Sequence, residues 1–215
     1  FTSDAKELPV EVRLFPGGVN TELIWKVTNE RGIESDLASI RETPHGAVVT
    51  AKGDGKFELR CATKNQGTIP SVVSAISFTA VGIGQPILNP YEEICGGLYT
   101  RSSGMIMPGL AKGLLLSGEG EAAAVFDGLD FGDYGSDTVT LPIFTTESGP
   151  VQLQLWTDLP SAPGSEKLGD FIYQKPSRWE VYQEETFVLP RRLKEISSFC
   201  IVSTEKLHIR GVVFK

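Results

Sequence analysis

The sequence predicts an all-β protein of two consecutive β-sandwiches, and three observations support this class. Short stretches of alternating apolar and polar residues recur along all 215 residues. The chain contains 23 Gly and 13 Pro, a composition typical of many tight turns. No stretch of about ten residues shows the apolar spacing of a helix. We therefore expect strands joined by turns from end to end.

Strand patterning is clear in the first part of the chain. Segment 22–28 places Leu23, Trp25 and Val27 on one face, which is the spacing of a half-buried strand. Segments 46–51 and 56–62 follow, and the Asp-Gly step in Lys52-Gly53-Asp54-Gly55 predicts a tight hairpin with positive φ. The other predicted strands are 10–14 and 72–81, with a turn at Phe15-Pro16-Gly17-Gly18. This density of short strands predicts a small antiparallel sandwich.

A domain boundary is expected at Gly82-Ile83-Gly84-Gln85-Pro86. This segment is short, contains Gly and Pro, and follows a complete set of strands. We therefore divide the chain into a first domain at 1–84 and a second domain at 85–215. Each is long enough to bury a core of its own.

The second domain also reads as strands throughout. Its predicted strands are 122–126, 138–144, 151–156, 169–173, 179–189, 197–202 and 207–214. In 151–156 the aliphatic residues point one way, and Gln152, Gln154 and Trp156 point the other. Pro142 lies opposite the apolar face of its strand. Because proline has no N–H to donate, we expect that strand at a sheet edge.

Charge and composition restrict the classes of partner. The net charge is −7, and most of the acidic excess lies after residue 85. Such a surface repels phosphates, so nucleic acids and anionic membrane surfaces are disfavoured and neutral ligands are favoured. No apolar stretch approaches the ~20 residues that cross a bilayer. The segment at Phe1 shows no leader pattern and reads as a cut into a longer polypeptide, which leaves the compartment open.

The three cysteines predict neither disulfides nor a zinc site. Cys61, Cys95 and Cys200 are an odd number without the CxxC spacing of metal ligands. Cys61 and Cys200 lie in apolar, strand-like segments, so we expect both to be small core residues. This use of cysteine favours a reducing compartment or a fold that needs no covalent cross-link.

Two motifs of the first domain resemble a known family. They are Ile24-Trp25-Lys26-Val27-Thr28-Asn29 and the turn Ala51-Lys52-Gly53-Asp54-Gly55, which is followed by the strand 57–62. Both resemble the bacterial Ig-like domains of adhesins and large glycosidases. The resemblance spans about residues 8–82 and implies an Ig-like sandwich.

Three stretches of the second domain resemble family 6 carbohydrate-binding modules. They are Val125-Phe126-Asp127-Gly128-Leu129-Asp130-Phe131-Gly132, Ser177-Arg178-Trp179-Glu180-Val181-Tyr182-Gln183 and Leu207-His208-Ile209-Arg210-Gly211-Val212-Val213-Phe214. In that order they are similar to the family's "xFxxVDFG", "GGWQTW" and "FNLDWFxF" blocks. The resemblance implies a galactose-binding-like jelly roll that binds a glycan without cleaving it.

An Ig-like domain followed by such a module is similar to the C-terminal region of family 2 glycoside hydrolases of the β-galactosidase type. That likeness implies two partners, which are a glycan, with galactose-containing chains as one candidate, and the catalytic domain of the parent chain. No phosphate loop, nucleophile elbow or HExxH motif is present, so we expect no enzyme activity in this chain alone. Two alternatives remain open: a structural module that braces the catalytic barrel or its oligomer, and a fragment of a cell-surface adhesin.

The resemblance also assigns candidate glycan contacts. Sugar rings present a flat apolar face, which needs an exposed aromatic platform and a few fixed polar groups. Trp179 matches the family's tryptophan that stacks on sugar in a loop-edge cleft, and His208 matches an asparagine that hydrogen-bonds a sugar hydroxyl. Trp156 and Tyr173 complete the expected carbohydrate-binding set. The alternatives are a Trp179 ring packed on the end of the sandwich and a solvent-facing His208 without a role.

The sequence departs from the family at positions that matter for the cleft and for metal binding. Leu114-Leu115-Leu116 stands where the family has its second aromatic wall. Only Leu88-Asn89-Pro90-Tyr91 matches the family's calcium segment, and Arg210 replaces a terminal Asp. Because Arg cannot ligate a cation, we expect no metal cofactor, with a structural calcium as the alternative.

Two further groups have competing interpretations. The Gln152, Gln154 and Trp156 face is either a second glycan surface or the cover for a neighbouring domain. The densest acidic run consists of Asp127, Asp130, Asp133 and Asp137. Its spacing fits no EF-hand, and we expect the Asp130 carboxylate to cap backbone N–H groups of its own turn.

Overall fold

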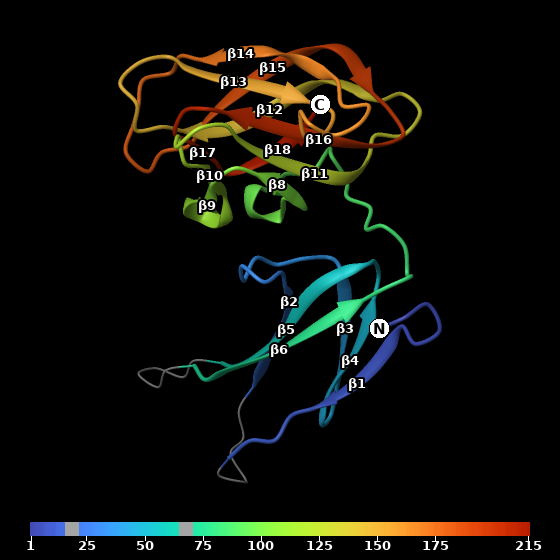
Figure 1. Cartoon of the computed structure of the whole chain (residues 1–215). Helices are drawn as coiled ribbons and strands as arrows, with labels where there is room; N and C mark the ends of the chain where they lie inside the picture. The colour runs from blue at the N-terminus through green and yellow to red at the C-terminus, as the bar shows by residue number, and fades with distance from the viewer. Residues whose placement is uncertain (16–21, 65–70) are drawn as a thin grey trace. The chain divides into compact units, whose positions relative to one another are not determined.

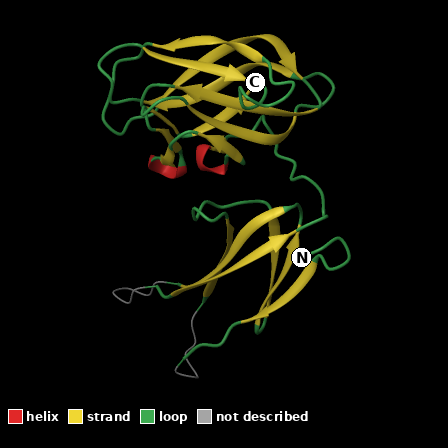
Figure 2. Ribbon diagram, in the orientation of Figure 1, coloured by secondary structure: helices red, strands yellow, loops and turns green. Residues whose placement is uncertain are grey.

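The computed structural model describes residues 1–15, 22–64 and 71–215, so Pro16–Gly18 of the first expected turn lies outside the described residues. The chain forms two compact units, Phe1–Pro86 (unit 1) and Ile87–Lys215 (unit 2). Strands dominate both units, and the helical elements within the described ranges are two short 3₁₀ turns, η1 at Gly96–Leu98 and η2 at Leu110–Lys112 (Figure 2). The all-β class is confirmed. No helix in those ranges has the length and hydropathy of a membrane span.

Unit 1 consists of two antiparallel sheets of three strands each (Figure 1). The strands are β1 Glu7–Glu11, β2 Leu23–Thr28, β3 Ala38–Thr43, β4 Gly46–Ala51, β5 Gly55–Thr63 and β6 Val73–Ala80. The strand order is β1-β4-β3 in one sheet and β2-β5-β6 in the other. Alternation explains the packing, because Phe57, Leu59 and Cys61 of β5 are buried while the residues between them are more exposed. The Ig-like identity of this unit stays a prediction.

Side chains from both sheets fill the core of unit 1. Phe1, Phe57 and Phe78 pack together with ring centroids 5.4 to 5.7 Å apart. Val49 of the other sheet is fully buried, and Trp25 packs against the same cluster, as the alternation in its strand predicts. Aromatic rings of the β2-β5-β6 sheet and Phe1 therefore pack against aliphatic residues of the other sheet, such as Val49, and stabilise this unit.

The hairpin expected at Lys52–Gly55 is wrong. Strands β4 and β5 lie in different sheets, so the Asp-Gly step carries the chain from one sheet to the other. Asp54 fixes this crossover, because its N–H donates to the Gly84 oxygen at 2.7 Å and its Oδ1 accepts the Ile83 N–H at 2.7 Å. Gly55 has a φ of 145°, so the positive φ is confirmed. The Asp-Gly sequence therefore predicted the backbone angle of the turn correctly, but it did not predict which strand β5 pairs with.

Unit 2 is built from two larger sheets. Its strands are β7 Ile94–Cys95, β8 Arg101–Ser103, β9 Ile106–Pro108, β10 Leu114–Leu116, β11 Ala122–Asp130, β12 Ser136–Phe144, β13 Val151–Trp156, β14 Lys167–Tyr173, β15 Gln183–Leu193, β16 Ile196–Ser203, β17 Leu207–Ile209 and β18 Gly211–Phe214. Sheet A has the order β14-β13-β16-β11-β8. Sheet B has the order β7-β18-β12-β17-β10-β9, with β15 also paired to β12.

The core of unit 2 lies between sheets A and B. Phe131, Phe199 and Phe214 form its aromatic centre, with ring centroids 4.7 and 5.1 Å apart in edge-to-face contacts. Leu153 and Leu141 approach from the two sheets and are at most 1% exposed. Cys200 is also fully buried, so the expectation that Cys61 and Cys200 are buried is confirmed.

The edge position expected for the strand of Pro142 is wrong. Strand β12 has β15 on one side and β18 and β17 on the other. The proline is tolerated because its missing N–H falls where the second partner changes from β18 to β17. There the Arg210 N–H donates to the Pro142 oxygen at 3.0 Å. The single strand expected at 207–214 is divided at Arg210 into β17 and β18.

Because each unit has its own core, we expect Phe199→Ala to destabilise unit 2 alone. The lost contacts and the cavity left behind should lower its free energy of unfolding by about 3–5 kcal/mol. Phe57→Ala should have the matching effect on unit 1. Calorimetry of both variants checks this expectation. A common shift of all unfolding transitions in both variants would contradict separate cores.

Candidate functional site

Sheet B carries apolar side chains on the face away from the core. Leu115 and Phe144 alternate with core residues of β10 and β12, so they point to the opposite face, yet both are buried. The strand register places them in one row, because Leu115 pairs with His208 and His208 pairs with Phe144. We define the outer-face cluster as Leu115, Phe144, Trp179, Tyr182 and His208.

Three rings cover Phe144. The ring centroids of Trp179, Tyr182 and His208 lie 6.0, 6.2 and 4.9 Å from that of Phe144. Trp179 is nevertheless 74% exposed, so most of its indole remains available to a ligand. It lies in the loop before β15, and the next residue, Glu180, has a φ of 57°. That left-handed conformation costs a non-glycine residue on the order of 1 kcal/mol and is typical of functional loops.

Side-chain hydrogen bonds hold the loop 174–182 against sheet B. Ser177 Oγ donates to the Thr145 oxygen directly after β12. Gln183 Nε2, at the start of β15, donates to the Pro176 oxygen at 2.9 Å. These contacts position the loop before any ligand arrives, which reduces the entropy that binding must overcome.

The polar groups of the outer-face cluster are neutral near pH 7. Burial lowers the pKa of His208 from its usual value of 6.5, and the nearby Lys206 lowers it further. His208 Nδ1 is buried and has no hydrogen-bond partner within the described ranges. Burial raises the pKa of Tyr182, whose hydroxyl donates to the Leu110 oxygen at 2.9 Å. The structure thus brings Trp179 and His208 together around Phe144, with Tyr182 beside them.

Further exposed apolar side chains lie on the strands and loops that form the outer-face cluster. Met107 pairs across the strands with Leu115, and Val181 lies two residues after Trp179. We define the rim patch as Met107, Leu110, Trp179 and Val181, all of which are exposed. The sequence pattern did not single out the first two, because they belong to short strands and turns without clear alternation.

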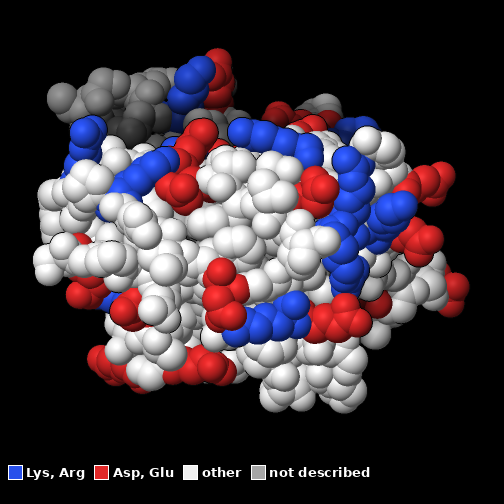
Figure 3. Space-filling model, turned by 90° about the horizontal axis from the view of Figure 1, so that it is seen from above, with Lys and Arg blue, Asp and Glu red and all other residues white. Residues whose placement is uncertain are grey.

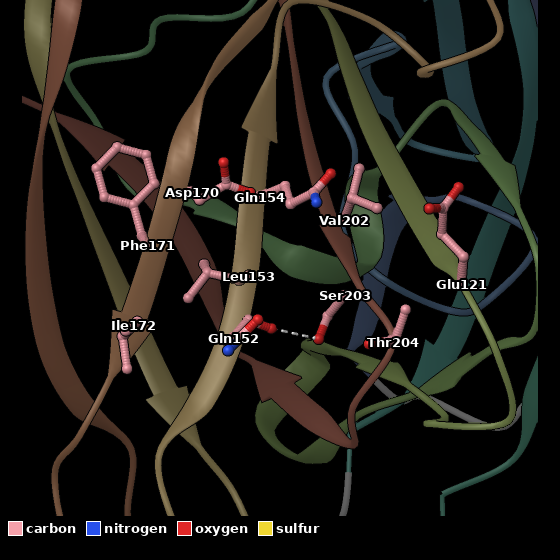
Figure 4. A pocket seen from close by; sticks show the side chains of 10 residues that line it. All are labelled: Glu121, Gln152, Leu153, Gln154, Asp170, Phe171, Ile172, Val202, Ser203 and Thr204. Carbon is pink, nitrogen blue, oxygen red and sulfur yellow. Dashed lines mark hydrogen bonds between the residues drawn. The ribbon is translucent and has the colours of Figure 1, made fainter.

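Sheet A carries a hollow of about 230 Å³ (Figure 4). Its lining residues are Glu121, Gln152, Leu153, Gln154, Asp170, Phe171, Ile172, Val202, Ser203 and Thr204. Gln152 pairs with Ile172 across the strands, and Gln154 pairs with Asp170. Ser203 Oγ donates to the main-chain oxygen of Gln152 at 2.8 Å. The two glutamines therefore share a polar hollow with Asp170 and Ile172, which are the outward residues of the adjoining strand.

Trp156 does not line this hollow. Its Nε1 donates to Gln154 Oε1 at 3.0 Å, and Lys167 Nζ lies 5.8 Å from its ring centroid. The half-buried ring packs on the apolar group that contains Cys200, and burial raises the pKa of that thiol to about 12. Trp156 therefore orients Gln154 and shields Cys200.

Tyr173 belongs to the core of unit 2. The side chain is 1% exposed, and its hydroxyl donates to the Ile143 oxygen at 3.4 Å. Gln183 Nε2 donates to the same hydroxyl at 3.1 Å. Its ring offers no face to a sugar, so the site proposed below does not include it.

The residues at the expected calcium position do not fit a calcium ion. Arg210 makes a two-pronged ion pair with Glu93, with Nε–Oε1 and Nη2–Oε2 distances of 2.7 and 3.0 Å. Asn89 Oδ1 accepts the Tyr91 N–H at 3.1 Å and so caps its own turn. No group of three or more metal-ligating side chains occurs in residues 1–15, 22–64 and 71–215. The Arg210–Glu93 ion pair connects this part of the chain to the segment between β17 and β18.

The acidic run serves local structure. Asp130 Oδ1 accepts the Gly132 N–H at 3.0 Å, so the predicted capped turn is confirmed. Asp127 accepts two bonds from Arg101, at 2.6 and 2.8 Å, and one from Ser198 Oγ at 2.7 Å. The Arg101 guanidinium is the main reason that the pKa of Asp127 falls to about 2.

Acidic and basic side chains are interspersed over the face in Figure 3, which shows no continuous basic surface.

Comparisons with known proteins agree with this fold. No family model matches the chain, and no curated protein matches it. A family 6 carbohydrate-binding module of Clostridium stercorarium, solved with cellobiose, is similar with a TM-score of 0.50 and 18% identity, over 60% of this chain and 97% of that chain. A second family 6 module has a TM-score of 0.49 and 14% identity, over 61% of this chain and 98% of that chain.

A family 43 arabinoxylan arabinofuranohydrolase of Bacillus subtilis, solved with cellotetraose, has a TM-score of 0.48 and 9% identity. The match covers 83% of this chain and 40% of the hydrolase chain. At 18% identity, the similarity to the Clostridium stercorarium module shows a common β-sandwich fold and no more. None of the three is a family 2 glycoside hydrolase, so that assignment stays a proposal.

We expect Asp127→Asn to weaken unit 2 in a pH-dependent way. A carboxylate whose pKa is lowered on folding stabilises the protein above its unfolded pKa, and this effect is lost as the pH falls through the folded pKa. The variant should therefore be less stable by on the order of 2 kcal/mol at about pH 5, with the difference vanishing near pH 2. Urea unfolding across this range measures it. The control is Asp133→Asn, because Asp133 is a nearby exposed residue. An equal loss of stability in this variant would contradict the account.

Proposed function

We propose that this chain is a non-catalytic carbohydrate-binding region and that Trp179 is the platform on which a sugar ring lies. The observation that carries the proposal is the 74% exposure of an indole whose loop is held by hydrogen bonds. An aromatic ring packs well against the apolar face of a pyranose. A preformed platform needs little ordering when the ligand binds.

Neighbouring polar groups support the same site. The neutral ring of His208 can donate and accept hydrogen bonds, which suits a sugar hydroxyl. Its Nδ1 is buried, so a hydrogen bond to a ligand would use Nε2. The net charge of −7 favours neutral over anionic glycans.

The hollow on sheet A is a second surface for the same class of ligand. Its two glutamines and its carboxylates offer donors and acceptors, and Ile172 offers an apolar contact. A longer glycan could use it in addition to the platform. The Trp179 platform carries the proposal, because Phe171 of the hollow packs against Phe187 and Trp156 packs on the group around Cys200.

The narrower proposal concerns the parent protein. We propose that the region belongs to a glycoside hydrolase of the β-galactosidase type and holds a galactose-containing glycan near the catalytic domain. Binding through a tethered module raises the effective concentration of substrate at the catalytic site. Support comes from the order of motifs, with an Ig-like pattern followed by the three carbohydrate-binding-module blocks.

A structural role is the second candidate, and one observation favours it. Leu115 stands beside His208 where a second aromatic wall would be expected, and the rim patch is apolar and exposed. Such a patch also suits docking against another protein surface. In this alternative the patch would rest on the catalytic domain and would not bind sugar.

We expect Trp179→Ala to weaken glycan binding by about tenfold or more, because the stacking contact is lost. Isothermal titration calorimetry against galactan, xylan and β-glucan oligosaccharides, with cellobiose included, measures the effect. Tyr134→Ala is the matched control, since Tyr134 is an exposed aromatic residue in another loop. Binding that survives Trp179→Ala but is lost in Gln154→Ala would move the site to the hollow. No binding to any glycan would leave the structural role.

We expect glycan affinity to fall as the pH drops below 6.5, because protonation puts a charge on half-buried His208. A histidine whose pKa is lowered on folding also makes the fold less stable in acid, since the unfolded chain binds the proton first. His208→Asn, which cannot be protonated, should bind with an affinity that is flat between about pH 5 and 8. Calorimetric titrations at several pH values test both proteins, and the same slope in both would count against His208.

A further inference from the structure

The fold leaves one ring nitrogen of His208 without a hydrogen bond. The residue lies in β17 between Leu115 and Phe144, its partners on the two neighbouring strands, and both partners are buried and apolar. Its ring lies against that of Phe144 at a centroid distance of 4.9 Å. Nδ1 is buried, and no group in the part of the chain that the structure describes bonds to it. A ligand therefore meets His208 through the other nitrogen, Nε2.

The burial of Nδ1 decides which nitrogen of His208 carries the proton. Burial and the nearby Lys206 lower the pKa of His208, so the ring is neutral near pH 7 and has one N–H donor and one acceptor nitrogen. A proton on Nδ1 would form a buried N–H without an acceptor, and such orphaned donors are rarer in folded proteins than orphaned acceptors. A proton on Nε2 can bond to water or to a ligand. His208 therefore offers a ligand a hydrogen-bond donor.

Tyr182 has the opposite polarity, because its hydroxyl hydrogen is already used. Its Oη donates to the Leu110 oxygen at 2.9 Å. Burial raises the pKa of Tyr182, so the hydroxyl keeps its hydrogen near neutral pH. Toward a ligand, Oη can then act only as an acceptor. The rings of Tyr182 and His208 both contact Phe144, so the acceptor and the donor belong to the same cluster.

The turn that carries the Leu110 oxygen is held in place on β17. Two hydrogen bonds of 2.9 Å close it, from the Gly109 N–H to the Gly113 oxygen and from the Gly113 N–H to the Leu110 oxygen. A Cβ atom at Gly113 would lie 2.5 Å from the Ile209 oxygen, so the turn packs directly on the backbone of β17. The fold therefore fixes the direction of the Tyr182 hydrogen bond before a ligand arrives.

We propose that the outer-face cluster binds a glycan through hydrogen bonds of fixed direction, in which His208 Nε2 donates and Tyr182 Oη accepts. This inference rests on the proposed function and narrows its ligand. The ligand oxygen at His208 needs only a lone pair, which a ring, glycosidic or hydroxyl oxygen has. The ligand group at Tyr182 must supply a hydrogen, as a hydroxyl or an amide does. A ligand with acceptors alone would leave the Tyr182 oxygen unpaired and would bind more weakly.

The position of the proton is measured without any glycan. Long-range ¹H–¹⁵N NMR correlations of the labelled full chain at about pH 8, where histidine is neutral, distinguish a protonated Nε2 from a protonated Nδ1. The chain has two histidines, and exposed His45 is the internal control. His45→Gln assigns the two sets of signals. We expect the Nε2–H form of His208 alone and a mixture of both forms in His45. An Nδ1–H form of His208, or a mixture like that of His45, would overturn the proposal.

Sugar analogues test the two directions. Methyl β-galactopyranoside and its monodeoxy and monodeoxyfluoro derivatives are titrated into the full chain, with the Trp179 indole signal as the readout. Fluorine can accept a hydrogen bond but cannot donate one. At the sugar position that meets His208, the deoxy compound should bind about fivefold more weakly, and the fluoro compound should bind nearly as well as the parent sugar. At the position that meets Tyr182, both derivatives should bind more weakly.

Two variants identify these positions. His208→Phe and Tyr182→Phe remove the polar atoms and keep an aromatic ring beside Phe144. Each should abolish the deoxy penalty at its own position, with a melting temperature close to that of the parent chain. Deoxy penalties that stay unchanged in both variants would contradict the proposal. Absence of binding by all the galactosides would contradict the galactose-containing ligand proposed above, and the NMR measurement of the His208 proton would still decide the present inference.

Discussion

Strict alternation of side chains across β12, β17 and β10 is the constraint on which unit 2 depends. The same strands send Ile143 and Ile209 into the core and display Phe144 and His208 on the opposite face. A slip of one residue would exchange the two sets, burying the imidazole and exposing aliphatic core residues. The register that stabilises the sandwich therefore also assembles the outer-face cluster. Trp179 rests on a support that cannot be changed without loss of the core.

Sheet A shows how side-chain size on one face decides where a surface is open. Its outward residues along β11 and β16 are small, namely Ala123, Val125, Cys200 and Val202. Trp156 and Leu159 pack on this group and cover it. The hollow remains further along the sheet, where Gln152 and Gln154 provide longer polar side chains without an aromatic cover. Packing thus closes one part of this face and leaves another accessible.

Much of the fold could be predicted, because alternation is local. Segment 151–156 gave a strand with both faces correctly assigned. The partner of β5 could not be predicted from the Asp-Gly step, because its angle does not specify which sheet the chain enters. Residues such as Met107 and Asp170 were missed for a related reason. They join their surfaces through register with other strands, and a single chain pattern does not contain that information.

An NMR titration of the three indole N–H signals tests the central claim most directly. Trp25 is in the core of unit 1, Trp156 is packed on sheet A, and Trp179 is exposed on the outer-face cluster. The signals report the three places separately in one experiment with each neutral oligosaccharide. The account predicts a saturable shift of the Trp179 signal with at least one of them and no shift of Trp25. A titration in which Trp179 stays unchanged with every glycan would contradict it.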